Sequence, residues 1–87
     1  MADVFAGHDS VTAPATSALA LSPSDGVELA AIPKAIYVGG GGDIVMRGVA
    51  GAADQTWKNV PAGTILPFRA RYVRATGTTA TNLLALY

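Results

Sequence analysis

Turn-forming residues interrupt the chain every 7–12 residues from residue 27 to the end. Gly, Pro, Asp and Ser supply the positive φ angles, fixed φ angles and local hydrogen bonds that tight turns need. The runs between them are short and rich in Val, Ile, Tyr and Phe, which favour strands. Such spacing is typical of a β-sandwich or barrel, and no heptad or helical period competes with it. We therefore predict an all-β fold, a small antiparallel β-sandwich (jelly-roll-like), with strands at 27–32, 35–39, 43–49, 55–60, 64–66, 68–75 and 82–87.

Alternation of side-chain type supports these strands directly, because successive side chains in a strand point to opposite faces. Ile44 and Met46 are predicted to share one face of their strand. In 68–73 the side chains predicted to share an apolar face are Phe68, Ala70 and Tyr72. Arg69 and Arg71 then fall on the opposite face.

The final strand, 82–87, is apolar at nearly every position rather than at every second one. Strands with this pattern are usually buried on both faces. We predict either a central strand of the core or a strand covered by another subunit, and we place Tyr87 in a protein interface.

Residues 1–26 differ from the rest, being rich in Ala and Ser and poor in large apolar side chains. A segment of this kind cannot offset its own ordering entropy unless it docks on something else. We predict an extended N-terminal arm and turn over 1–26, followed by a single β-sandwich domain over 27–87. Val4 and Phe5 are the strong apolar anchors of the arm and are predicted to dock on a partner protein or a neighbouring subunit.

The size and charge of the chain indicate a subunit of an assembly. A chain of 87 residues forms one small domain, and such domains are usually reinforced by disulfides, metals or oligomerisation. Cysteine is absent, and a single histidine cannot by itself hold a structural metal. Charged residues make up 14% of the chain, against about 25% in an average soluble domain, and the formal net charge is zero. A surface so poor in charge favours association over repulsion.

No constellation of residues supports catalysis. The glycine run at 39–42 lacks the Lys-Ser/Thr pair and the following helix of a phosphate loop, so we interpret it as a hairpin connection. The only histidine, His8, lies beside Asp9 and Ser10 in the predicted arm, where no scaffold fixes a catalytic triad. We expect no enzymatic activity, no cofactor and no bound metal.

Arg69, Arg71 and Arg74 raise the question of nucleic-acid binding. Domains that bind nucleic acid usually have a pI above about 9, whereas this chain has a pI of about 6.5. We expect no nucleic-acid binding. We assign Arg69 and Arg71 to a protein interface, where a planar guanidinium satisfies several acceptors at once.

Trp57 and Tyr37 are open to two interpretations. Together they would provide an aromatic platform for a sugar ring, which would make the chain a small carbohydrate-binding module. A single tryptophan in a small β domain more often packs in a core or an interface, and no set of polar side chains accompanies these rings in the sequence. We place Trp57 in a protein interface and keep the carbohydrate-binding module as the alternative.

Neither a membrane span nor a secretory leader is apparent in the sequence. No apolar run approaches the roughly 20 residues that cross a bilayer. The first residues are acidic rather than basic and lead into no hydrophobic segment. We expect a protein synthesised in the cytoplasm that contacts no membrane.

Three stretches of the chain, 35–44, 60–69 and 75–87, resemble a known family in their order and approximate spacing. They are similar to the head spike base proteins of alphaproteobacterial gene transfer agents and related tailed phages. Residues 3–6 and the turn at 22–26 are similar as well, so the resemblance covers nearly the whole chain.

The resemblance implies a structural virion protein with a compact β-sandwich fold and no catalytic residues. Such proteins sit on the five-fold vertices of the capsid and carry a head fibre that contacts the recipient cell. The implied partners are the capsid protein at the vertex, the head spike fibre protein and other copies of the chain in a homo-pentamer. The implied location is the head of a virion or phage-like particle, after synthesis in a bacterial cytoplasm.

Another capsid decoration or a tail component is the remaining structural alternative, because each of these roles needs a small associating β unit. Deleting residues 2–20 is predicted to leave a folded domain that no longer joins particles.

Overall fold

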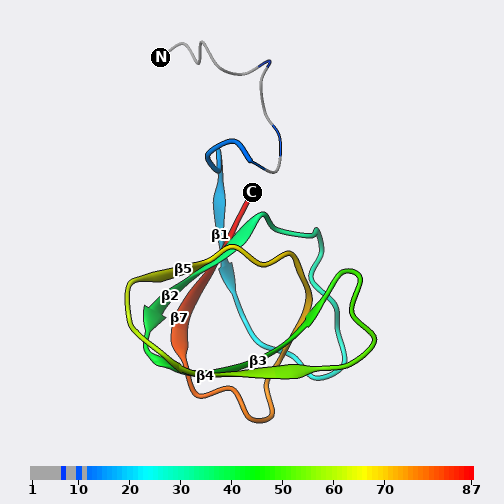
Figure 1. Ribbon diagram of the computed structural model, residues 1–87, viewed down its shortest axis with the longest axis vertical. Coiled ribbons are helices and arrows are strands. Elements are labelled where there is room, and N and C mark those ends of the chain that lie inside the picture. The colour runs from blue at the N-terminus through cyan, green and yellow to red at the C-terminus, as the bar shows by residue number, and fades with distance from the viewer. Residues whose placement is uncertain (1–6, 8–9, 11) are drawn as a thin grey trace.

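The chain folds into two antiparallel β-sheets that pack as a sandwich (Figure 1). The computed structural model describes residues 7, 10 and 12–87. Its strands are β1 (Ala18–Leu21), β2 (Ala35–Gly40), β3 (Gly42–Gly48), β4 (Gln55–Val60), β5 (Thr64–Leu66), β6 (Ala70–Arg74) and β7 (Thr81–Leu86). One sheet has the order β1-β7-β2-β5 and the other the order β4-β3-β6. The predicted small antiparallel β-sandwich is confirmed.

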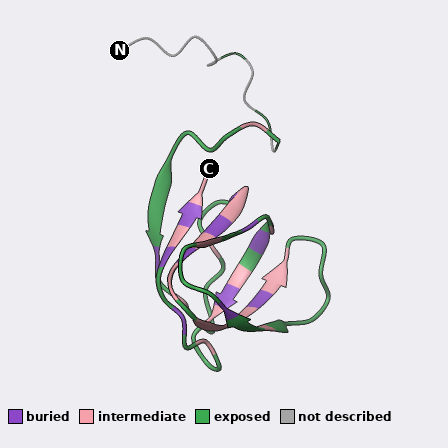
Figure 2. Ribbon diagram, turned by 60° about the vertical axis from the view of Figure 1, so that its left-hand side comes forward, coloured by how far each residue is buried: buried purple, intermediate pink, exposed green. Residues whose placement is uncertain are grey.

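The core lies between the two sheets and is formed by alternate residues of the strands (Figure 2). Ile44 and Met46 of β3, which were predicted to share one face, are both fully buried. The four-stranded sheet contributes Ile36, Val38, Leu83 and Ala85. Among the described residues no polar or charged side chain is buried, so the interior depends on apolar packing. The same residues contain no helix long and apolar enough to cross a membrane.

The segment 27–32 forms no strand, so that prediction is wrong. Val27 is 68% exposed. The chain here runs beside β6, where the N–H groups of Ser24 and Leu29 donate to the carbonyls of Val73 and Arg71 at 2.8 and 2.9 Å. Two isolated hydrogen bonds of this kind attach residues 24–29 to the edge of the sheet without forming a continuous ladder.

β1 lies within 1–26, the segment predicted to be an extended arm. Antiparallel pairing with β7 places Leu19 opposite Ala85 and helps bury Leu21. The pattern of the sequence missed this strand because alanine and serine favour strands only weakly, and β1 depends on its partner. The division at residue 26 into an arm and an independently folding domain stays a prediction. Val4 and Phe5 lie outside the described residues.

β6 departs from the simple alternation that the sequence predicted. Ala70 and Val73 are both buried although they lie three positions apart. The register of β6 against β3 shifts within the strand, so that Arg71 is an extra residue. A β-bulge of this kind reverses the faces of the residues that follow it. The predicted grouping of Tyr72 with Ala70 is therefore wrong, and Tyr72 lies on the outer face together with Arg74.

The glycine run at 39–42 connects the two sheets rather than two paired strands. β2 belongs to the four-stranded sheet and β3 to the other, and only Gly41 separates them. The crossing is crowded, because a Cβ atom on Gly42 would lie 2.7 Å from both the Ala80 nitrogen and the Thr79 hydroxyl oxygen. The hairpin interpretation is wrong: glycine is required here for close backbone approach at a corner of the sandwich.

Candidate assembly interface

The outer face of the four-stranded sheet carries a row of apolar side chains that crosses all four strands. Strand pairing places Ala20 opposite Leu84, Leu84 opposite Tyr37, and Tyr37 opposite Ile65. A second row consists of Ala18, Leu86 and Ala35. None of these residues belongs to the buried core, and Ile65 is 57% exposed.

The side chains on this outer face are uncharged, which is unusual for a sheet that faces water. Antiparallel sheets normally alternate apolar side chains inside with polar ones outside. In β7, however, both the buried Leu83 and the outward Leu84 and Leu86 are apolar. An exposed sheet face of this composition is typical of a surface that another protein covers. The predicted central position of the last strand is confirmed, since β7 lies between β1 and β2.

The outer face of the three-stranded sheet is polar by contrast. The guanidinium carbons of Arg47 and Arg74 lie 5.5 and 4.0 Å from the centre of the Tyr72 ring. Asp54 joins the two arginines, with its carboxylate oxygens 3.3 Å from Arg47 Nε and 3.1 Å from Arg74 Nε. These side chains therefore hold the loop before β4 against β6.

Two exposed acidic residues, Asp25 and Glu28, hold the connection between β1 and β2 beside β6. Asp25 accepts hydrogen bonds from the N–H and hydroxyl groups of Thr76 at 2.9 and 2.7 Å, and Glu28 accepts one from Arg71 at 2.8 Å. The Thr76 hydroxyl lowers the pKa of Asp25 from its ordinary 3.8, and the Arg71 hydrogen bond lowers the pKa of Glu28 from 4.5. Arg71, predicted to face a partner, thus makes its ion pair within its own chain.

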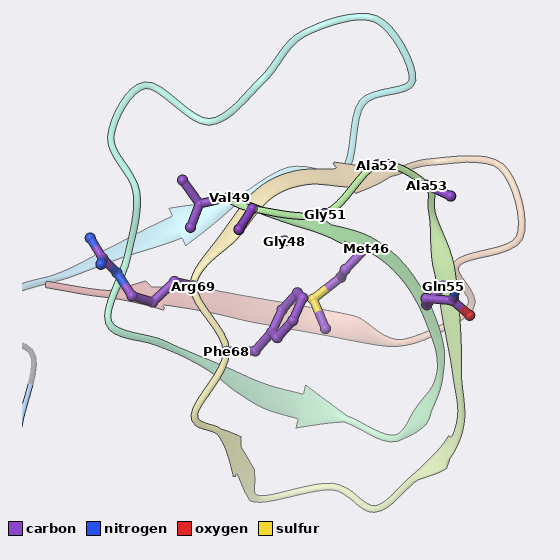
Figure 3. A pocket seen from close by; sticks show the side chains of 10 residues that line it. Met46, Gly48, Val49, Gly51, Ala52, Ala53, Gln55, Phe68 and Arg69 are labelled. Carbon is purple, nitrogen blue, oxygen red and sulfur yellow. The ribbon is translucent and has the colours of Figure 1, made fainter.

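A concavity of about 550 Å³ opens between the β3–β4 loop and the chain that enters β6 (Figure 3). Met46, Phe68, the exposed Val49 and the small residues Gly48 and 50–53 form most of its lining. Phe68 also contacts Trp57, with ring centroids 5.1 Å apart and an angle of 58° between the planes. The largely apolar lining makes the concavity a second candidate contact surface.

The residues predicted to lie in protein interfaces are separated in the structure. Arg69 is exposed and lines the concavity, while Trp57 is half-buried on β4 against Phe68. Tyr87 packs against the core, and its hydroxyl group donates to the Ala31 carbonyl at 3.1 Å. Contacts of these residues with a partner stay predictions.

Trp57 and Tyr37 do not form one aromatic platform. Tyr37 lies on the outer face of the four-stranded sheet, whereas Trp57 packs toward the core from an edge strand of the other sheet. A sugar platform needs rings presented together on one surface. The arrangement therefore offers the carbohydrate-binding alternative no support.

Two acidic residues of the described chain hold loops in place. No group of three or more His, Cys, Asp or Glu side chains lies together among residues 7, 10 and 12–87. Asp25 and Asp54 hold neighbouring loops through the hydrogen bonds and ion pairs already described. His8 and Asp9 lie outside the described residues.

The sequence did not identify the row formed by Ala20, Leu84, Tyr37 and Ile65. Its members come from four strands, and a row across a sheet is defined only once strand order and register are known. One signal was available, because the apolar pattern of 82–87 predicted a strand that is central or covered by another subunit.

No known family model and no curated protein matches the chain. Among solved structures, the chain is similar to a component of a structure described as the capsid of a native GTA (gene transfer agent) particle computed with C5 symmetry. The two chains share 42% sequence identity with a TM-score of 0.88, and the match covers 99% of this chain and 100% of the other. Sequence and fold therefore agree over the whole length of both chains.

Proposed function

Because the chain belongs to the same family as this capsid component of a gene transfer agent particle, we propose that it is a structural protein of such particles and forms the base of a head spike. In this role it occupies the five-fold vertices of the capsid and anchors a head fibre for attachment to recipient cells. The full-length agreement in sequence and fold is the observation that carries the proposal.

Five copies in a ring are the proposed assembly at each vertex. The particle that contains the related chain was computed with C5 symmetry, which supports a five-fold arrangement. A ring requires two different contact surfaces on each copy, because head-to-tail contacts close under rotation. The uncharged outer sheet face and the apolar concavity are two separate surfaces suited to such contacts.

The proposed partners are the capsid protein below the ring and the head spike fibre protein above it. Synthesis in the bacterial cytoplasm precedes assembly into the particle head. The role requires no catalytic group. Contacts through uncharged surfaces also suit a particle that meets different salt concentrations, since ionic screening acts on charges.

Comparison of particles with and without the protein tests this proposal. Particles are purified from the parent strain, from a strain that lacks the gene, and from that strain carrying the gene on a plasmid. Electron cryomicroscopy is expected to show density above the five-fold vertices in the first and third preparations only. Attachment to recipient cells is expected to fall in the second.

Density lost from the capsid faces or the tail would instead identify another capsid decoration or a tail component. Particles that are identical in all three preparations would overturn a structural role altogether.

A further inference from the structure

The two sheets have four edge strands, and three of these edges are protected against pairing with another chain. β6 is covered by the connection between β1 and β2, in which the N–H groups of Ser24 and Leu29 donate to β6 carbonyls. β5 has three residues and is followed directly by Pro67. β4 carries the charged Lys58, and Asn59 has a left-handed backbone with φ 55°. Covering, short length, proline, charge and irregular backbone are the means by which natural sheets block edge pairing.

β1 is one residue longer than β5 and has no covering loop, proline, charge or irregular backbone. Its four residues are apolar, the residues that flank it are serines, and Leu19 is 60% exposed. Ser17 exchanges both backbone hydrogen bonds with Tyr87, at 3.1 and 2.8 Å. Inward and outward hydrogen bonding alternates along an antiparallel strand, so Ala18 and Ala20 direct their N–H and C=O groups away from β7. These two residues offer donors and acceptors to a further strand.

We propose that β1 receives the N-terminal residues 2–6 of a neighbouring copy as an added strand. The proposal rests on the ring of copies proposed above and names the contact that joins them. Residues 2–6 contain Val4 and Phe5, which favour strands and are the apolar anchors of the predicted arm. An added strand gains main-chain hydrogen bonds from the sheet edge and side-chain contacts at alternate positions.

Thr16 and Ser17 are hydrogen-bonded to Tyr87, and the described residues before them extend beyond the end of the sheets (Figure 1). Gly7 has no neighbouring atom within 4 Å of its Cβ position, and the exposed Ser10 and Thr12 make their side-chain hydrogen bond with each other. The eleven residues between residue 6 and β1 span up to about 36 Å when extended. The molecule measures 26 and 17 Å along its two shorter axes. The segment is therefore long enough to reach a copy placed alongside.

Side-chain alternation favours one pairing, with Phe5 opposite Leu19. Phe5 would then cover a leucine that its own chain leaves exposed. The neighbours of Phe5 fall opposite Ala18 and Ala20 in either strand direction, because successive side chains change face. Val4 thus joins the outer sheet face and lengthens an apolar row without adding a charge. Each copy gives its arm to the next, which is the head-to-tail contact that closes a ring.

Disulfide cross-linking tests this contact, since the chain contains no native cysteine. Cells that produce the particles co-express the single variants Phe5→Cys and Leu19→Cys, and the whole lysate is oxidised and separated on a non-reducing gel. Val27→Cys replaces Leu19→Cys as the matched control, because Val27 is also exposed and lies outside β1. A disulfide needs Cβ atoms within about 4.5 Å, so we expect about tenfold more cross-linked dimer with Leu19→Cys than with Val27→Cys.

The double variant Phe5→Cys/Leu19→Cys distinguishes exchange between copies from contact within one copy. Exchange around a ring is expected to give a ladder that ends at five chains. A cross-linked monomer would show that the arm pairs with its own β1 and would overturn the exchange. Dimers formed by Leu19→Cys alone would show that β1 pairs with a second β1. Equal cross-linking of the Leu19 and Val27 variants would exclude the arm from this edge.

The outcome separates this inference from the proposed function. If the particles show vertex density but the Phe5–Leu19 cross-link does not form, the spike-base role stands and the strand exchange is overturned. The cross-link in a protein absent from the vertices would support the exchange and overturn the spike-base role.

Discussion

Arg74 and Tyr72, two positions apart on β6, stack on each other, with the guanidinium carbon 4.0 Å from the centre of the ring. Residues two positions apart in a strand share a face, and the β-bulge at Arg71 makes the face of Tyr72 and Arg74 the outer one. Arg74 also donates from Nε to Asp54 at 3.1 Å and from Nη1 to the Asp25 carbonyl at 2.6 Å. One side chain thus joins two loops to the three-stranded sheet.

We expect Arg74→Ala to lower the free energy of unfolding by about 1–3 kcal/mol, because it removes a stacked cation and its hydrogen bonds. Urea unfolding followed by tryptophan fluorescence measures the loss. Lys58→Ala, at an exposed position on β4, is the control and is expected to change stability by less than about 0.5 kcal/mol. Equal losses in the two variants would show that the cluster does not stabilise the fold.

Stability is expected to fall in acid, because folding lowers the pKa values of Asp25 and Glu28. A carboxylate with a lowered pKa stabilises the folded state above its unfolded value, and this contribution disappears as the pH falls through the folded pKa. The loss should therefore begin near pH 4.5 and continue below 3.8, the ordinary values of the two groups. Urea midpoints measured between pH 6 and pH 2.5 test the direction.

Asp25→Asn should show a smaller acid-dependent loss than the parent chain, since the amide does not titrate. An unchanged loss in this variant would assign the acid sensitivity to other carboxylates.

Ile65→Lys is expected to weaken association while leaving the monomer folded. Ile65 is 57% exposed at the end of the outer apolar row, so a charge there costs little in the monomer and becomes unfavourable once the face is covered. Light scattering behind a sizing column gives the mass in solution, and gel analysis of purified particles gives incorporation. Val27→Lys is the matched control on an exposed apolar residue outside this sheet. Normal incorporation of Ile65→Lys would exclude this end of the face from the assembly contact.

Two N-terminal deletions should differ in their effects. Deleting residues 2–11 leaves β1 and the hydrogen bonds between Ser17 and Tyr87 intact, so stability should change by less than about 0.5 kcal/mol while particle incorporation is lost. Deleting residues 2–20 removes most of β1 and uncovers the edge of β7, so this chain should unfold at lower urea. Because the longer deletion removes most of β1, the shorter deletion is the better test of the arm. Normal incorporation after the shorter deletion would contradict a role for the arm.

Local patterns determined the fold class because turns and strand alternation are properties of neighbouring residues. The spacing of Gly, Pro, Asp and Ser predicted the sandwich, and the alternation along 43–49 predicted that Ile44 and Met46, both buried in the structure, share one face. The continuous apolar pattern of 82–87 predicted a strand that is either central or covered by another subunit, and β7 is central in its sheet. A low charge content, also visible in the sequence, predicted a subunit that associates.

Tertiary structure alone decided the features that depend on partners distant in the sequence. β1 has weak strand character of its own and forms because β7 supplies its hydrogen bonds. Tyr72 reached the outer face because the register against β3 introduced a bulge. Ala20, Leu84, Tyr37 and Ile65 became one row only when four strands were placed in order. Alternation tells which side chains share a strand face, but strand order and register determine which faces meet, and these are set by the packing of the whole chain.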